Sequence, residues 1–196
     1  MSTPNHPHGL LPAKKAPARL LVIHLLALGA LFLSATPATA AVELETDPLA
    51  FWLNGYSFHV ALAREHSRTD LGVFALELPE DAKNPGYRVA FQGVGVKWDY
   101  TGNSADGGFW GMEVSQATLT FDYTPPGFDQ PTESAEREVR LVGVRTGYRF
   151  GHETFYITPW IGISQMLGMK AVELGGVPYD AQKVQVFPTI HLGYRF

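Results

Sequence analysis

The chain of 196 residues contains no cysteine and no apolar run long enough for a membrane-spanning helix. Without cysteine, a disulfide framework and Cys-based zinc or redox sites are excluded. The longest apolar segment, 20–33, is interrupted by His24 and falls short of the ~20 residues that span a bilayer as a helix. An excess of positive charge is also lacking. The formal net charge of −4 argues against a general binder of nucleic-acid phosphates.

The composition nevertheless indicates a folded chain. Glycine and proline are frequent, with 20 and 14 residues, but a hydrophobic fraction of 45% is too large for a disordered protein. The length favours a single domain with enough residues to form a core.

Residues 1–40 have the layout of a secretory signal peptide. Three basic residues and no acidic ones occur in this stretch, and small residues ending in Ala-Thr-Ala at 38–40 follow the apolar segment. A basic region, a short apolar region and an A-x-A cleavage site occur in this order in signal peptides. An uncleaved N-terminal anchor is the alternative. Cleavage near Ala41 leaves residues 41–196 with 12 Lys and Arg against 19 Asp and Glu, a net charge of −7.

Alternation of two residue classes is the strongest pattern in residues 41–196. In 139–150, 154–165 and 184–196 most alternate residues are apolar, and those between them are largely Gly, Thr, Ser, Arg or His. Period-two alternation indicates strands with two different faces. These strands exceed the ~5–6 residues usual in soluble proteins and match the ~9–11 of tilted transmembrane strands. The pattern predicts an all-β fold, an antiparallel transmembrane β-barrel with an apolar outside and a polar interior.

Aromatic residues end several of the apolar faces. The pairs Trp98/Tyr100, Tyr148/Phe150 and Tyr194/Phe196 fit the aromatic girdle of such a barrel. Residues 145–150 (RTGYRF) and 191–196 (HLGYRF) also share the ending Gly-Tyr-Arg-Phe. We interpret this short repeat as one solution to the membrane interface, used by two strands that point the same way.

The signal peptide, the alternating strands and the terminal Tyr194-Arg195-Phe196 resemble the small outer-membrane β-barrel proteins of Gram-negative bacteria, of the eight-stranded OmpA and opacity-protein type. The resemblance implies one barrel domain over 41–196, a location in the bacterial outer membrane and contact with its lipids. It also implies that Phe196 is read by the barrel-insertion machinery. The resemblance implies a location more than an activity, because many functions share this architecture.

The number of predicted strands is one short of an even number. Seven segments are predicted, at 55–65, 69–78, 87–100, 108–123, 138–150, 154–167 and 183–196, whereas single-chain bacterial barrels have an even number. The segment 42–53 is either the eighth strand, followed by an Asn54-Gly55 hairpin turn, or a short helix capped by Asp47. Near Gln92-Gly93 and Ser115-Gln116 the apolar phase slips, which predicts β-bulges.

The connections predict an orientation. With the C-terminus in the periplasm, 150–154 is a short periplasmic turn, and 124–137 and 168–182 are longer outer loops.

Inward-facing polar residues are the candidates for a ligand site. Eight are expected in the lumen: His59, Lys97, Asp99, Glu113, Arg145, Arg149, His191 and Arg195. They could bind an anion or a polar headgroup. The alternative, which we favour, is an ion-paired filling, because charges in a narrow barrel need partners or water.

Catalytic and metal motifs are weak. His66-Ser67, with Glu65 and Asp70 nearby, permits a hydrolase interpretation, but a charged turn at 64–70 explains it without chemistry. No two histidines have metal-ligand spacing, and 101–108 lacks the full calcium-loop pattern. No metal and no cofactor are therefore expected.

Two prolines occur in the middle of predicted strands. Pro159 and Pro188 each remove a ladder hydrogen bond. They indicate either two local bulges, which we favour, or a weakened seam through which an apolar molecule passes into the bilayer.

We therefore expect a non-enzymatic outer-membrane barrel that is structural or acts through its outer loops. A narrow channel or carrier for small or apolar molecules is the first alternative, and a lipid-modifying enzyme is the second. The sequence identifies neither a ligand nor an oligomeric state.

Overall fold

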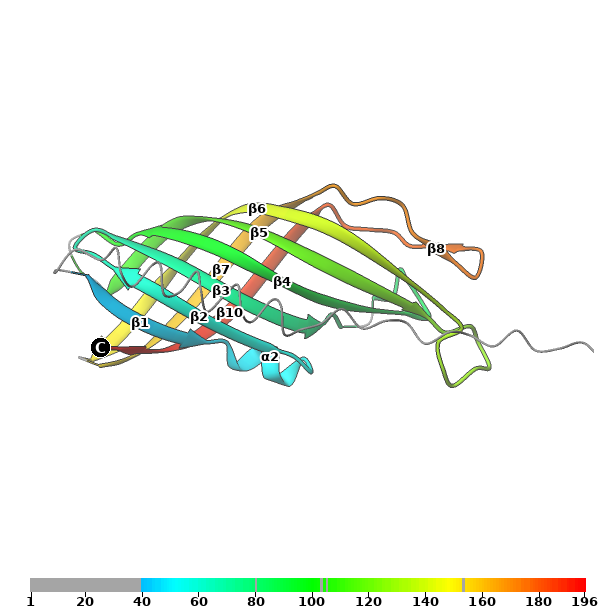
Figure 1. Cartoon of the computed structure of the whole chain (residues 1–196), viewed down its shortest axis with the longest axis horizontal. Helices are drawn as coiled ribbons and strands as arrows, with labels where there is room; N and C mark the ends of the chain where they lie inside the picture. The colour runs from blue at the N-terminus through cyan, green and yellow to red at the C-terminus, as the bar shows by residue number, and fades with distance from the viewer. Residues whose placement is uncertain (1–39, 80, 103, 105, 153) are drawn as a thin grey trace, which may run out of the picture. The chain divides into compact units, whose positions relative to one another are not determined.

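Eight antiparallel strands close into a barrel in the order β1-β10-β7-β6-β5-β4-β3-β2 (Figure 1). The computed structural model describes residues 40–79, 81–102, 104, 106–152 and 154–196. Except for Ala40, the predicted signal peptide lies outside the described residues. The barrel strands are β1 (Ala41–Thr46), β2 (Tyr56–Ala63), β3 (Ser67–Glu77), β4 (Tyr87–Tyr100), β5 (Gly107–Tyr123), β6 (Glu133–His152), β7 (Phe155–Leu167) and β10 (Val184–Arg195). The predicted all-β fold with eight antiparallel strands is confirmed.

The segment 42–53, left open between strand and helix, contains both. β1 pairs with β2 and β10 and is the eighth strand, and helix α2 (Pro48–Trp52) follows it. Asp47 caps the helix, with its Oδ1 accepting from the Leu49 N–H at 2.8 Å, and Asn54 turns the chain into β2 with a φ of 54°. No helix among the described residues is long and apolar enough to cross a membrane.

The two ends of the barrel differ. At one end, hereafter the short-turn end, lie the C-terminus and the ends of the strands that meet at the brief connections β2–β3, β4–β5 and β6–β7 (Figure 1, left). The opposite, long-loop end carries the connections 78–86, 124–132 and 168–183, whereas α2 lies beside the middle of the barrel (Figure 1). The predicted outer loop at 124–137 is shorter than expected, because β6 begins at Glu133 and pairs with β5 from there.

The connection 168–183 folds over the long-loop end. It contains the small hairpin of β8 (Glu173–Leu174) and β9 (Val177–Pro178), and it places Val172 and Leu174 in the apolar core of that end. Tyr87 ties it to β4, since its hydroxyl accepts from Leu174 N at 3.0 Å. Tyr179 packs edge-on against Phe121, and this burial raises the pKa of its phenol. The loop thus caps the barrel.

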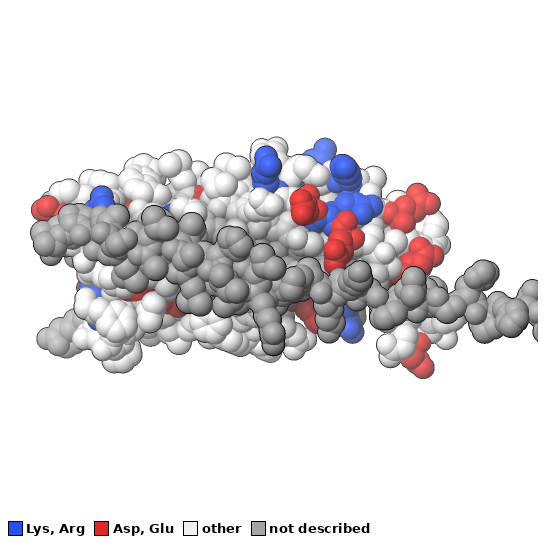
Figure 2. All heavy atoms as spheres, viewed as in Figure 1, with Lys and Arg blue, Asp and Glu red and all other residues white. Residues whose placement is uncertain are grey.

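Polarity inverts along the barrel axis. In the half nearer the short turns, the outward side chains are apolar, as at Val142, Val144 and Phe150 of β6, and the interior is charged. In the long-loop half, the outward residues of β6 are polar, as at Glu136 and Arg140. The interior there is a cluster of apolar side chains: Tyr87, Val89, Ala117, Leu119, Phe121, Tyr123, Val139, Leu141, Met166, Val172 and Leu174. On the face shown in Figure 2, surface charges gather toward the long-loop end.

This inversion corrects the bulge predictions. β4 and β5 pair without interruption from Tyr87–Tyr123 to Tyr100–Trp110, so no extra residue enters at Gln92-Gly93 or at Ser115-Gln116. Gln92 and Gln116 face outward like their apolar neighbours along the strand. The apparent slip of phase therefore marks the level at which the barrel changes from an apolar to a polar exterior.

The two strand prolines have separate explanations. The backbone N–H groups of even-numbered residues in and after β10 point toward β1. The N–H of Phe196, for example, donates to the Val42 carbonyl oxygen. β1 ends at Thr46, opposite Leu192, so at Pro188 no strand on that side needs a donor. Pro159 lies in β7 at the one gap of the described β6–β7 ladder, between Trp160 and Ile157.

The favoured bulges are absent from the β7–β10 pair, whose register is unbroken from Val184–Gln165 to Tyr194–Phe155. The alternative, passage of an apolar molecule into the bilayer at these prolines, stays a prediction.

Candidate functional site

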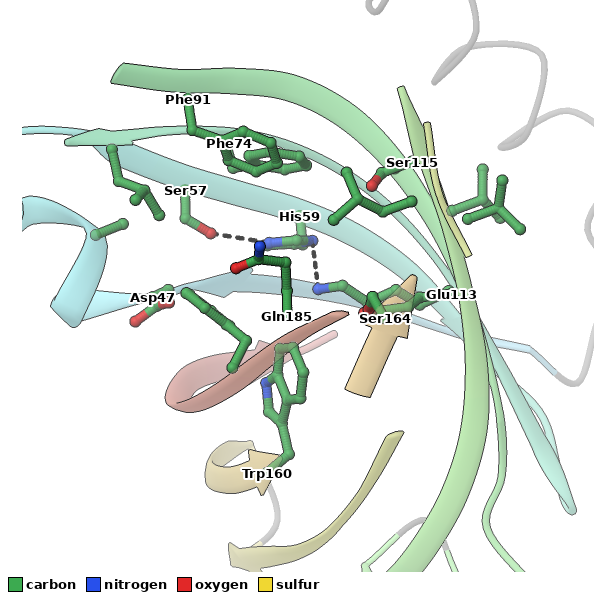
Figure 3. Close-up of a pocket in the computed structure, with 18 of the residues that line it drawn as sticks. Asp47, Ser57, His59, Phe74, Phe91, Glu113, Ser115, Trp160, Ser164 and Gln185 are labelled. Atoms are coloured by element: carbon green, nitrogen blue, oxygen red, sulfur yellow. Dashed lines mark hydrogen bonds between the residues drawn. The ribbon is translucent and has the colours of Figure 1, made fainter. Parts of the chain in front are cut away.

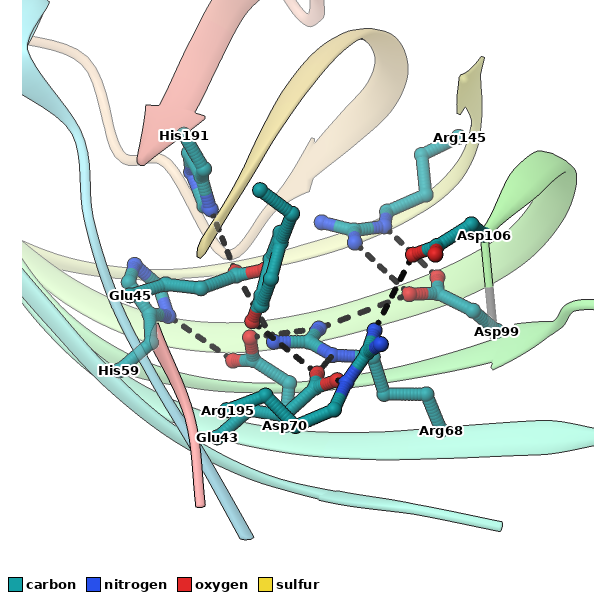
Figure 4. A network of polar contacts seen from close by, with 11 residues as sticks. Glu43, Glu45, His59, Arg68, Asp70, Asp99, Asp106, Arg145, His191 and Arg195 are labelled. Atoms are coloured by element: carbon teal, nitrogen blue, oxygen red, sulfur yellow. Dashed lines mark hydrogen bonds and ion pairs between the residues drawn. The ribbon is translucent and has the colours of Figure 1, made fainter. Parts of the chain in front are cut away.

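An ion-paired network fills the lumen near the short-turn end (Figure 4). Arg68 of β3 is its centre and is fully buried. Its Nε donates to Glu43 at 2.8 Å and its Nη1 to Asp70 at 3.0 Å, while its Nη2 lies 2.9 Å from Glu45. Several carboxylates thus share one guanidinium, an arrangement in which the loss of the cation would leave buried charges without a partner.

Further pairs extend this network across the barrel. Arg145 binds Asp99 through Nε and Nη2, at 2.8 and 2.9 Å. Arg195 donates to Glu43 at 2.8 Å. The guanidinium carbons of Arg149 and Arg195 lie 5.1 and 5.3 Å from the ring centroid of Tyr156, within the range of a cation–π interaction. We call this whole cluster the plug: Glu43, Glu45, Arg68, Asp99, Arg145, Arg149, Tyr156 and Arg195.

A cavity of about 140 Å³ lies in the lumen, where Leu119, Leu141 and Met166 of the apolar core form part of its lining. Figure 3 shows residues that line it. Its polar lining includes Ser57, His59, Lys97, Glu113, Ser164 and His191, and its apolar lining includes Phe74, Leu76, Phe91, Leu119, Leu141 and Met166. Asp47 and Ala50 also contribute, so the cavity reaches the wall segment of α2. An amphipathic cavity of this kind is typical of small-molecule sites.

Three polar side chains form a chain of hydrogen bonds at the polar side of this cavity. Ser57 Oγ lies 2.9 Å from His59 Nε2, and His59 Nδ1 lies 2.8 Å from Asp70 Oδ1. All three residues are buried, at 3%, 5% and 1% exposure. Gly72 makes room for this arrangement, because a Cβ there would lie 2.0 Å from His59 Nδ1.

Two further polar groups surround the His59 ring. Lys97 Nζ lies 3.3 Å from His59 Nδ1, and the His191 ring lies 4.8 Å away, centroid to centroid. His191 is held by Glu45 at 2.8 Å. The buried indole N–H of Trp160 has no acceptor among the described residues, although Trp160 lines the cavity. It is a donor that a bound molecule could use.

The eight lumen candidates separate into two groups. All face inward, and His59, Lys97, Glu113 and His191 line the cavity, where Glu113 accepts from the Ser164 hydroxyl. The others, Asp99, Arg145, Arg149 and Arg195, belong to the plug. The ion-paired filling is therefore observed for part of the set.

The hydrolase arrangement considered at His66-Ser67 is not formed among the described residues, because Asp70 binds His59 and Arg68 instead. His66 lies in the short turn between β2 and β3, with its Nδ1 2.6 Å from the Gly102 carbonyl oxygen. Ser67 already begins β3. The predicted turn at 64–70 thus ends early, and Arg68 and Asp70 face the lumen instead.

Sequence reasoning missed Ser57, Asp70, Glu43, Glu45 and Arg68 as lumen residues. The acidic pair lies in the short strand β1, whose six residues give little room for alternation to be visible. A usable signal was the spacing of the charges themselves. Glu43-x-Glu45-x-Asp47 and Arg68-x-Asp70 each place charges on one face of a strand.

No family model matches the chain, and no curated protein matches its sequence. Among the described residues, no group of three or more His, Asp or Glu side chains is arranged to hold a metal ion. A function must therefore be inferred from the geometry of the lumen and from the outer surface of the barrel.

Proposed function

We propose that the protein is an outer-membrane β-barrel of a Gram-negative bacterium, closed to ions at its short-turn half and open to partners through its long-loop half. The outward apolar belt carries this proposal. The outward face of β10 holds only apolar or aromatic side chains from Tyr194 to Val184. The ten steps between these two residues extend about 34 Å along the strand, or about 26 Å in height at a tilt of about 40°, near the ~25 Å band of outer-membrane barrels.

Aromatic residues support the same placement. Tyr100, Trp110, Phe150, Phe155 and Tyr194 are exposed near the short-turn end, where a membrane interface would lie. A second group, Phe51, Trp52, Tyr56 and Phe58, is exposed around α2. The polar exterior beyond the belt would then project from the membrane. In this proposal Phe196, exposed at the end of β10, is the residue read by the insertion machinery.

Membrane fractionation and gel mobility test this proposal. We expect the full chain to fractionate with outer-membrane lipid and, when unboiled, to migrate differently from the boiled sample, because a closed barrel resists detergent unfolding. A periplasmic protein without a heat-dependent shift would contradict it.

The plug argues against the channel alternative. Its buried arginines and carboxylates occupy the lumen in the short-turn half. We expect no resolved conductance steps when the purified barrel is inserted in a planar bilayer, and steps of a steady size would contradict this.

A carrier or receptor for a small amphipathic molecule is the second candidate function. The cavity of about 140 Å³, with its polar and apolar sides, favours it. Native mass spectrometry of the purified barrel, before and after delipidation, tests it. A retained small molecule lost in Phe91→Trp, which fills the cavity, is the expected result.

A further inference from the structure

We propose that Ser57, His59 and Asp70 form a catalytic triad that hydrolyses carboxylic esters with a short acyl group. This goes beyond the proposed barrel function, which does not depend on it. The order of the contacts carries the inference: a serine hydroxyl, then a histidine, then a carboxylate, at 2.9 and 2.8 Å. A nucleophile, a base and a group that orients the base are recognised by such geometry on unrelated folds.

The tautomer of His59 follows from its partner. His59 Nδ1 faces both Asp70 Oδ1 at 2.8 Å and the Lys97 ammonium at 3.3 Å. An ionised carboxylate only accepts hydrogen bonds and an ammonium only donates them. We assign the proton of neutral His59 to Nδ1 from the shorter contact, with Asp70, so Lys97 does not donate to this nitrogen. Nε2 is then left as the acceptor for the hydroxyl of Ser57. Asp70 is held in place by the Nη1 of Arg68 at 3.0 Å. This is the protonation state in which a histidine can take a proton from serine.

The position of the three side chains relative to the cavity fits this division of roles. Ser57 and His59 line the cavity, whereas Asp70 is fully buried beside the plug. The loop 168–183 caps the long-loop end and the plug fills the other. At the level of Ser57, β1 has already ended, because Thr46 pairs with Phe58. The barrel wall there is formed by α2, which packs against β2, β3 and β10.

The size and lining of the cavity define the substrate class. A cavity of about 140 Å³ is close to one of about 150 Å³ that holds benzene, so it accepts an acyl group of a few carbons. Phe74, Phe91 and Leu119 supply an apolar surface for it. The unpaired indole N–H of Trp160 and the ammonium of Lys97 are donors for the polar ester group.

The reaction proceeds in two balanced steps. Ser57 Oγ attacks the ester carbonyl carbon while His59 Nε2 takes the hydroxyl proton, and the alcohol then leaves with that proton as the acyl group stays on Oγ. A water molecule next attacks the acyl carbon and gives a proton to Nε2. The carboxylic acid leaves, and Nε2 returns the proton to Ser57 Oγ.

Labelling with a fluorophosphonate tests the triad, because this probe reacts with activated serines. The full-length barrel, shown to be folded by its heat-dependent gel shift, is treated and digested, and mass spectrometry locates the adduct. We expect the adduct on Ser57. Ser134→Ala, which removes an exposed serine of β6 that does not line the cavity, is the matched control and should leave the labelling of Ser57 unchanged.

Hydrolysis of nitrophenyl esters provides the second readout. We expect turnover of the butyrate ester in the wild type, much slower turnover of the laurate ester, and a loss of about 10²-fold or more in His59→Ala. Gly72→Ala should give a similar loss with the barrel still folded, because the added Cβ would displace the His59 ring.

Asp70 acts as a positioning residue, and its test needs a separate signature. In Asp70→Asn we expect kcat to fall with little change in KM, and the ¹⁵N spectrum of His59 to show the proton moved from Nδ1 to Nε2. A folded wild-type barrel without an adduct on Ser57, or an adduct that forms equally fast in His59→Ala, would overturn the triad and leave a purely structural cluster.

Discussion

The two halves of this barrel are opposites in polarity although the same strands run through both. In the short-turn half, β6 presents Val144 outward and the charged Arg145 inward. In the long-loop half, the same strand presents Glu138 outward and Val139 inward. The alternation continues without a break, and only the chemistry of the two faces is exchanged. The alternation of a strand therefore does not by itself tell which of its two faces points into the barrel.

The difference also separates two ways of filling a barrel. Apolar side chains fill the long-loop half and are stabilised by removal from water. Ion pairs fill the short-turn half, and their contribution to stability depends on every buried charge having its partner. Substitutions should therefore have opposite consequences in the two halves.

The largest effect is expected at the centre of the plug. Arg68→Met keeps most of the volume but leaves Glu43, Glu45 and Asp70 without their shared cation. We expect a loss of about 3–5 kcal/mol in the free energy of unfolding. Urea titration of the barrel in detergent, followed by gel mobility, measures it. Arg140→Met on the polar exterior is the control and should leave the midpoint unchanged. Equal midpoints for the two variants would refute the role given to the plug.

An outward charge should distinguish the belt from the polar exterior. Val144 is 60% exposed in the belt, and Val144→Arg should cost about 2–4 kcal/mol when that surface faces lipid. Thr120→Arg, also outward but in the long-loop half and opposite Glu136, should cost little. The comparison requires refolding into lipid bilayers, with unfolding followed by tryptophan fluorescence. Similar losses at both positions would contradict the proposal that the belt, and not the polar exterior, faces lipid.

The smallest effects on stability are expected when a hydroxyl is added to the apolar interior or removed from the charged one. Val139→Thr buries a hydroxyl in the apolar core and should cost about 1–3 kcal/mol. Thr158→Val in the charged half should be neutral or slightly stabilising, since the Thr158 hydroxyl has no partner among the described residues. Chemical denaturation of both variants checks this, and a destabilised Thr158→Val would point to a hydrogen bond that this hydroxyl makes.

Strand positions and lumen-facing residues could be predicted from the sequence because alternation is a local property. His59, Lys97 and His191 all face inward as expected, and Tyr148, Phe150 and Tyr194 face outward. The shared Gly-Tyr-Arg-Phe ending also has a common geometry. Gly147 and Gly193 pair with Trp160 and Tyr156 of β7, respectively, and a Cβ on either glycine would collide with that side chain.

The candidate triad could not be predicted because it depends on pairing between strands. Ser57 and His59 are two residues apart on β2, but Asp70 reaches His59 only through the register of β2 with β3, in which His59 lies opposite Gly72. Registers depend on turn geometry and packing. The sequence instead drew attention to His66-Ser67, which are adjacent in the chain but separated by the strand boundary.

The short first strand has a consequence for association between chains. Beyond Thr46, β10 runs on with one backbone edge that no strand covers, and such an edge is a template on which another chain can add a strand. Pro188 lies on that edge and offers no donor, and α2 is held over it by the hydrogen bond from Thr189 to Asp47 at 2.6 Å. The five-residue helix α2 and Pro188 therefore hinder the pairing of this edge of β10 with a strand of another chain.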